Sequence, residues 1–225
     1  LQELALFSSD ETRLVQINDD IDAAKQKYQE AAQALSESRS KAAVKLSKLI
    51  SKSMAELNMP HGKFHIDIYQ DKQQSLSVNG NDSVSYLASL NPGQALEAMN
   101  KVASGGELSR ISLAMQVILA DKIITPTLIF DEVDVGISGP TAAMVGKKLQ
   151  QLAKNTQVIC VTHLPQVASK GHQQLFVAKL TDGEHTETTV TELSNDGRVQ
   201  EIARLLAGDK ITENSLANAQ ELLAG

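Results

Sequence analysis

Residues 127–134 read TLIFDEVD and decide the fold class. A short apolar run at 127–130 ends directly in the carboxylates of Asp131 and Glu132, which is typical of a buried strand in a parallel sheet. A second such run at 157–162 ends at His163, and a helical pattern that begins at Pro140 separates the two runs. Strands that alternate with helices predict an α/β domain.

The pattern on either side of this core predicts further short elements. A long helix is expected after Gly106, with Leu108, Ile111, Met115, Ile118 and Leu119 on one face. Alternating or apolar runs predict strands, and turn residues separate them. The expected strands are 64–68, 76–78 and 84–88, followed by a hairpin of 175–180 with 188–193 around Asp182-Gly183. Two closing helices are expected at 199–206 and 215–223.

The N-terminal quarter of the chain predicts one long helix. The first 59 residues contain no glycine, and Pro60 is the first proline. Apolar or small residues recur in steps of three and four, with Glu11 as the one charged member, which is a heptad seam. Its other members are Leu4, Phe7, Leu14, Ile17, Ile21, Ala24, Tyr28, Ala31 and Leu35. We therefore expect a coiled-coil arm at 1–58 and a globular lobe at 59–225, the alternative being one amphipathic helix on a globular core. Because the chain opens at Leu1 inside this pattern, a fragment of a longer protein is expected.

Composition narrows the class of protein. The net charge is −6, aromatic residues make up 3% of the chain and tryptophan is absent. These values argue against a broad basic surface and against stacking platforms for single-stranded nucleic acid. With a single cysteine, Cys160, no signal peptide and no long apolar run, a cytoplasmic protein without a membrane partner is expected. Cys160 is expected to be a buried core residue.

Residues 103–110, ASGGELSR, predict a phosphate-binding helix start. Gly105 and Gly106 let the backbone approach an anion, and the helix that follows presents unpaired N–H groups and the positive end of its dipole. Ser104 adds a hydroxyl donor. The alternative is a plain glycine-rich turn that caps a helix.

The polar residues that end the two strands suggest hydrolytic chemistry. One carboxylate of the Asp131–Glu132 pair can orient Mg²⁺, and the other can position and deprotonate water. His163 can donate to a phosphate oxygen. The alternatives are a helix-capping aspartate, a solvated glutamate and a structural histidine.

The order and spacing of these three signals resemble the distal half of an ABC ATPase head. By that resemblance, Ser104, Gly105, Gly106 and Glu107 form the signature motif, which contacts the γ-phosphate of ATP held by an opposite head. Asp131 would assist Mg²⁺, Glu132 would be the general base, and His163 would be the γ-phosphate switch. Asp134 would be the D-loop residue that crosses the interface between heads.

Within that class the wording of the motifs is similar to the RecN family. The stretches are KVASGGELSR at 101–110, FDEVDVGISG at 130–139 and VTHLPQVA at 161–168. The resemblance implies a bacterial SMC-like ATPase of recombinational double-strand-break repair, with the C-terminal lobe of the head preceded by a coiled-coil helix. It also implies a nucleoid-associated homodimer through ATP-sandwiched heads that binds DNA. The net charge of −6 and the lack of a helix rich in Arg and Asn predict that the DNA sequence is not read.

One element of such a head is missing from the sequence. No G-x-x-x-x-G-K-[ST] motif exists, since Lys63 and Lys147 are followed by Phe64 and Lys148. The family carries this phosphate-binding loop in its N-terminal half. We therefore expect that half as a partner, and no ATP hydrolysis by this chain alone. A nucleotide-binding subunit of an ABC transporter and a non-catalytic coiled-coil scaffold are the two alternatives.

Overall fold

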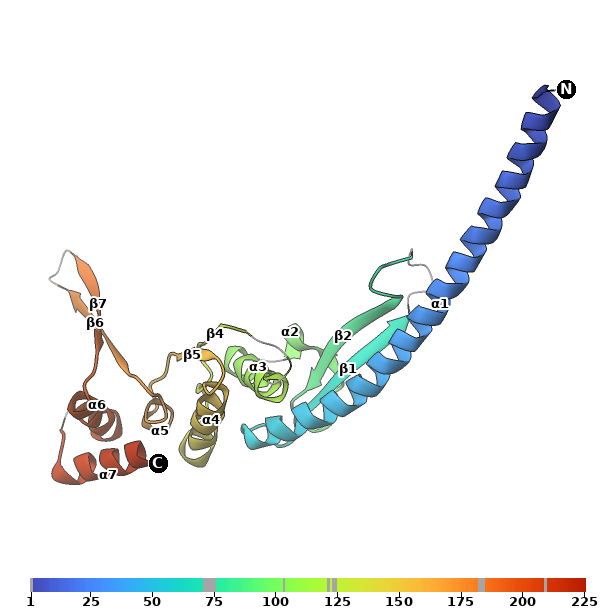
Figure 1. Cartoon of the computed structure of the whole chain (residues 1–225). Helices are drawn as coiled ribbons and strands as arrows, with labels where there is room; N and C mark the ends of the chain where they lie inside the picture. The colour runs from blue at the N-terminus through green and yellow to red at the C-terminus, as the bar shows by residue number, and fades with distance from the viewer. Residues whose placement is uncertain are drawn as a thin grey trace. The chain divides into compact units, whose positions relative to one another are not determined.

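The computed structural model describes residues 2–70, 76–102, 104–120, 122, 125–181, 185–208 and 210–225, without the side chains of 2–12, 102, 180 and 181. The chain contains both helices and strands, and Figure 1 labels them. They are α1 (Gln2–Glu56), β1 (Lys63–Gln70), β2 (Asp82–Ser89), β3 (Glu97–Ala98), α2 (Met99–Val102), α3 (Gly105–Leu119), β4 (Thr127–Phe130), α4 (Gly139–Leu152), β5 (Gln157–Cys160), α5 (Pro165–Ala168), β6 (Leu175–Thr181), β7 (Thr186–Glu192), α6 (Asn195–Ala207) and α7 (Glu213–Ala224).

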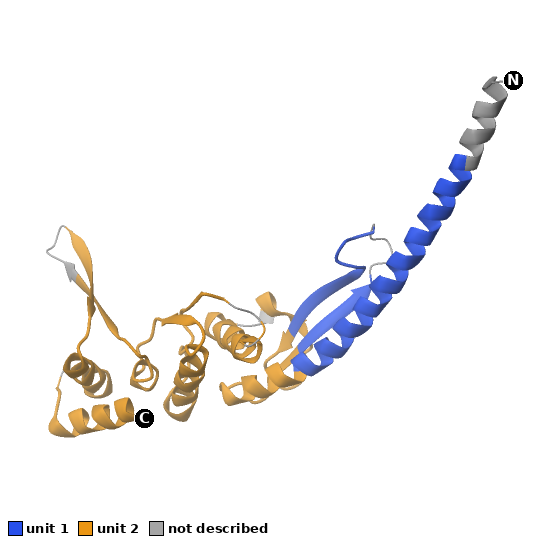
Figure 2. Ribbon diagram, in the orientation of Figure 1, with its two compact units in different colours: residues 1–47, 65–87 blue, residues 48–64, 88–225 orange. Residues whose placement is uncertain are grey.

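The chain divides into two compact units (Figure 2). The first consists of residues 1–47 and 65–87, and the second of residues 48–64 and 88–225. Both units contain a part of α1, which runs without a break for 55 residues. The division into an arm at 1–58 and a lobe at 59–225 stays a prediction.

In the first unit, polar contacts hold the start of β2 and the segment before it against α1. Arg39 donates to the buried carboxylate of Asp82 at 2.8 Å, and this bond lowers the pKa of Asp82. The Tyr28 hydroxyl donates to Asn81 and accepts from the backbone N–H of Ser77 at 3.1 Å. Part of the predicted heptad seam faces solvent, since Leu14 is 60% exposed and Ile17 and Ile21 are each 45% exposed. We expect an exposed seam of this kind where a partner helix packs.

The second unit has its core where the end of α1, α3 and α4 bury their apolar residues. Ile50 and Met54 of α1 are fully buried, and so is Leu57, which directly follows that helix. Ile111 and Leu113 of α3 are fully buried as well. An ion pair of 2.8 Å joins Glu56 of α1 to Lys148 of α4. The face that α3 buries differs from the predicted one, because Arg110, Leu113 and Ala114 are buried with Ile111 while Leu108 is 38% exposed.

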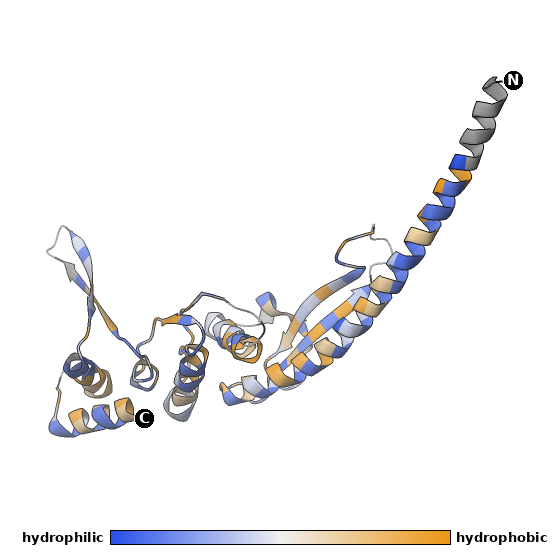
Figure 3. Ribbon diagram, in the orientation of Figure 1, coloured by the Kyte–Doolittle hydropathy of each residue, from blue (hydrophilic) through white to orange (hydrophobic). Residues whose placement is uncertain are grey.

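The two strands that decide the fold class pair in parallel, as predicted, with Thr127 opposite Gln157 and Phe130 opposite Cys160. The prediction that both strands are buried is wrong for this chain. Phe130 is buried, but Ile129 is 70% exposed and Ile159 is 45% exposed. Figure 3 shows apolar residues in both strands. The physical reason is that the sheet has only these two strands among the described residues, so one of its faces has no cover.

The C-terminal elements follow the prediction closely. Strands β6 and β7 form the expected antiparallel hairpin, with Val177 opposite Val190. The predicted turn residues Asp182 and Gly183 lie outside the described residues. Helices α6 and α7 pack around Ile202, Ala203 and Ala219, which are fully buried.

Other details differ from the sequence-based expectations. Residues 76–78 form no strand, and Val78 is fully exposed, so no neighbour stabilises an extended conformation there. The short elements β3, α2 and α5 were not predicted, because two to four residues are too few to carry a period. Among the described residues, no helix has an apolar stretch long enough to span a membrane.

Candidate active site

The turn that follows β4 is the centre of the site. The strand ends at Phe130, and Glu132 adopts a left-handed backbone conformation with φ of 57°. For a residue other than glycine this conformation costs on the order of 1–3 kcal/mol. Two hydrogen bonds support it: the Glu132 N–H donates to Oδ1 of Asp131 at 2.9 Å, and the Val135 N–H donates to the Glu132 carbonyl at 3.2 Å. The strand therefore does not continue through the two carboxylates, which are both exposed.

The signature stretch begins α3, as predicted, with Ser104 as its N-cap. The Ser104 backbone N–H and hydroxyl both donate to Oε2 of Glu107, at 2.9 Å and 2.7 Å. Glu107 therefore orients Ser104. The first backbone N–H groups of a helix have no partner within it, so the start of α3 offers donors to an anion.

The two glycines of α3 lie against the β4 turn. A Cβ atom on Gly105 would lie 2.5 Å from Oε2 of Glu132. A Cβ atom on Gly106 would lie 3.1 Å from the Glu132 carbonyl oxygen and 3.2 Å from Cβ of Val135. The absence of a side chain at both positions thus brings the signature stretch and the predicted general base together.

Two further side chains of α3 hold the same turn. The Ser109 hydroxyl donates to the Asp131 carbonyl at 2.9 Å, and Nη1 of Arg110 donates to the Val135 carbonyl at 2.7 Å. Arg110 is only 5% exposed. Burial lowers its pKa, and the charge of Glu107 opposes that shift. Its Nε is buried without a hydrogen-bond partner among the described residues.

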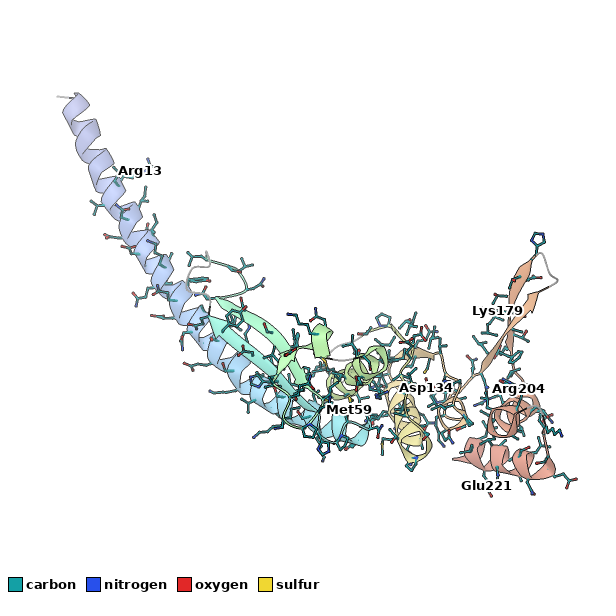
Figure 4. All side chains as sticks on the ribbon, turned by 180° about the vertical axis from the view of Figure 1, so that it is seen from behind. Arg13, Met59, Asp134, Lys179, Arg204 and Glu221 are labelled. Carbon is teal, nitrogen blue, oxygen red and sulfur yellow. The ribbon has the colours of Figure 1, made fainter. Side chains whose placement is uncertain are left out.

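The far end of the turn contacts the end of β5. Asp134, labelled in Figure 4, is 2% exposed. Its Oδ2 accepts a short hydrogen bond from the Thr162 hydroxyl and a second bond of 3.3 Å from the His163 backbone N–H. The same oxygen lies 3.6 Å from Nδ1 of His163, whose side chain is 69% exposed.

A cavity of about 280 Å³ lies between α3 and β4, and its lining includes Leu108, Ser109, Ile129 and Asp131. Among the described residues no group of three or more His, Cys, Asp or Glu side chains forms a metal site. Mg²⁺ in nucleotide sites is commonly held by one or two carboxylates together with phosphates and water. The exposed carboxylate of Asp131 fits that limited role.

Cys160 lies near the carboxylates of Asp131 and Asp134. It is half-buried rather than fully buried as predicted, because β5 has no cover on one face. Burial raises the pKa of its thiol to about 12, and the negative charges of Asp134 and Asp131 add to the shift.

The structure brings the predicted residues together along one turn. Gly105, Gly106, Asp131 and Glu132 meet at its start, and Asp134 and His163 meet at its end. Three residues that hold this arrangement were not assigned roles from the sequence: Ser109, Arg110 and Thr162. Their place beside the motifs is the only signal that the sequence offers. Ser109 and Arg110 follow Ser104-Gly105-Gly106 by about one helical turn, and Thr162 directly precedes His163.

Comparison with known proteins assigns the chain to a family. No protein-family model matches the sequence. It is 54% identical over 99% of its length to DNA repair protein RecN of Vibrio cholerae, and 50% identical over 88% to DNA repair protein RecN of Haemophilus influenzae. It covers 40% and 35% of those two proteins. A solved Smc head domain with a coiled coil and joint, derived from Pyrococcus yayanosii, has a similar fold, with a TM-score of 0.55 and 19% sequence identity. The match covers 76% of this chain and 30% of the Smc chain. The α/β fold is thus that of an SMC-type head, and the chain belongs to the RecN family as a segment that spans about two fifths of the V. cholerae protein.

Proposed function

We propose that this chain is the C-terminal part of an SMC-like ATPase of DNA double-strand-break repair, in which ATP is bound between two heads. The observation that carries the proposal is the meeting of three motifs at one turn. The turn at residues 131–135 contains the two carboxylates that follow β4. The first turns of α3 and the histidine after β5 both contact this turn.

Each polar group of the turn has a role in this proposal. The start of α3 would bind the γ-phosphate of a nucleotide held by the opposite head, through the Ser104 hydroxyl and the backbone of Gly105 and Gly106. Ser104 must then turn its hydroxyl away from Glu107, to which it now donates. Asp131 would hold Mg²⁺, which neutralises phosphate charge when bound.

Hydrolysis would depend on Glu132 and His163. The Glu132 carboxylate is exposed and lies next to Gly105, so it can accept a proton from a water molecule placed between α3 and the turn. His163 would donate to the γ-phosphate, since its ring follows the end of β5 and is 69% exposed.

A second polypeptide segment is required for catalysis. The sequence lacks the loop and lysine that hold the β- and γ-phosphates. Ile129 of β4 is 70% exposed, Ile159 of β5 is 45% exposed, and Val161, which directly follows β5, is 60% exposed. Parallel strands are normally covered on both faces. We propose that the N-terminal half of the same protein covers these exposed residues and supplies the phosphate-binding loop.

The DNA partner is proposed from the family and from charge. The chain has a net charge of −6 and no recognition helix rich in Arg and Asn, so it is not expected to read base sequence. Contacts of the complete protein with DNA are then to phosphates and weaken steeply with salt. A transporter subunit is not supported, because the relatives found are DNA repair proteins and the fold neighbour is an Smc head.

Phosphate release by the complete protein tests this proposal. Glu132→Gln removes one carboxylate charge, so turnover should fall by about 10²–10⁴-fold while nucleotide binding is retained. Glu221→Gln makes the same change at an exposed position of α7 and serves as the matched control, with unchanged turnover. If the unaltered protein binds ATP and does not hydrolyse it, the chain is part of a non-catalytic scaffold and the proposal is wrong.

A further inference from the structure

Asp134 is a buried carboxylate whose surroundings are specific. At 2% exposed it has lost nearly all contact with water, which is unfavourable for a charged group unless donors replace the water. Two donors to Oδ2 come from the segment that follows β5: the Thr162 hydroxyl and the His163 backbone N–H. The third neighbour of this oxygen is Nδ1 of the His163 ring, at 3.6 Å.

The Thr162 hydroxyl donates to Asp134. The same oxygen accepts from the Leu164 backbone N–H at 3.1 Å, which leaves its single hydrogen for Asp134. Oδ2 of Asp134 therefore acts as an acceptor toward the Thr162 hydroxyl and the His163 backbone N–H, and it is the atom that faces the histidine ring.

We propose that Asp134 positions His163 within the same chain by holding a proton on Nδ1. A ring nitrogen that faces an ionised carboxylate is favoured as the donor, and the state of one nitrogen determines what the other can do. A rotation of the exposed ring shortens the 3.6 Å separation to a hydrogen bond, as happens when catalytic sites close on substrate. Nε2 is then the nitrogen directed toward solvent, and it donates to a phosphate oxygen when it too carries a proton.

This assignment departs from the role that the family resemblance implies for Asp134, which was to cross the interface between two heads. The carboxylate lies inside its own chain and has three contacts with residues 162 and 163. Any effect of Asp134 on hydrolysis rests on the proposed function, whereas its effect on the state of the His163 ring does not.

The ring state can be measured by NMR of histidine nitrogens in the complete protein, with ¹⁵N-labelled histidine. His163→Gln identifies the His163 signals. In a neutral ring we expect the proton on Nδ1. With its amide oxygen in the place of Oδ2, Asp134→Asn keeps the shape and an acceptor for Thr162, but it removes the carboxylate charge that favours a proton on Nδ1. We expect the share of rings protonated on Nδ1 to fall in that variant and the proton to move to Nε2. Asp196→Asn, at an exposed position in the first turn of α6, is the control and should leave the His163 signals unchanged.

Turnover distinguishes a positioning role from a purely structural one. Asp134→Asn should lower kcat by about 10–100-fold, as is typical of a partner that orients an active-site histidine, with KM for ATP changed less than about twofold. If the His163 proton lies on Nε2 in the unaltered protein, the proposal is overturned whatever the ATPase does. If the proton moves in Asp134→Asn but kcat and the thermal unfolding midpoint are unchanged, Asp134 does not position His163 for the reaction. Absence of hydrolysis in the unaltered protein would instead count against the proposed function.

Discussion

Gly105 and Gly106 are adjacent in α3, yet substitution by alanine should have different consequences. The added Cβ at Gly105 would meet only the end of the exposed Glu132 side chain, 2.5 Å away, which can rotate aside. The added Cβ at Gly106 would meet the Glu132 carbonyl at 3.1 Å and Val135 at 3.2 Å and 3.3 Å. The turn backbone would have to move to admit it, and Gly106 is buried.

The magnitudes follow from these contacts. Both residues lie in the first turn of α3, so the gain in helix propensity, up to about 1 kcal/mol, is similar for the two variants. Overpacking typically costs about 1–3 kcal/mol and applies only at Gly106. Gly106→Ala should therefore be less stable than Gly105→Ala by about 1–3 kcal/mol. Gly105→Ala should retain stability and lose turnover in the complete protein, because it displaces the Glu132 carboxylate.

Urea unfolding of the 225-residue chain, followed by circular dichroism, measures the difference in unfolding free energy between the two variants. A lower midpoint for Gly106→Ala with an unchanged slope is the expected result. Equal midpoints, or a higher midpoint for Gly106→Ala, would show that the turn does not pack on α3 as described.

Three further predictions concern neighbouring residues. Arg110→Met should destabilise the chain by about 1–3 kcal/mol in urea unfolding, because the buried Val135 bond of 2.7 Å is lost, whereas Lys147→Met at an exposed position of α4 should not. Cys160, with a thiol pKa of about 12, should react with iodoacetamide slowly at pH 8, and the rate should rise about tenfold per pH unit up to pH 10. A rate at pH 8 equal to that of a free cysteine would contradict the burial. The purified chain alone should release phosphate from ATP only at background level, and magnesium-dependent turnover that Glu132→Gln abolishes would refute the need for a second half.

The sequence predicted those parts of the fold that depend on local pattern. The absence of glycine and proline before Pro60 predicted α1, and the carboxylates after an apolar run predicted the end of β4. Parallel pairing of β4 with β5 followed from the helix between them. The strand expected at 76–78 failed, because two apolar residues in alternation do not form a strand without a neighbour to pair with.

The geometry of the site depends on contacts between distant segments, which a local pattern does not reveal. The left-handed conformation of Glu132 is supported by Asp131 and Val135, and the turn as a whole is held by α3. Burial of β4 and β5 was predicted from their apolar runs, but burial requires a covering layer that the described residues do not supply. The inward direction of Asp134 follows from its bond with Thr162, a residue 28 positions away in sequence.

Association of heads in the presence of ATP is the most direct test of the proposed ATP sandwich. Nucleotide affinity and light scattering are measured for the complete protein with Glu132→Gln and with Ser104→Arg. Glu132→Gln should bind ATP and form a larger species that persists, because the nucleotide is not cleaved. Ser104→Arg should bind ATP with nearly unchanged affinity and remain unassociated, because it places bulk and charge at the exposed start of α3. ATP-dependent association of Ser104→Arg equal to that of the unaltered protein would contradict the assignment of α3 to the opposite head's nucleotide.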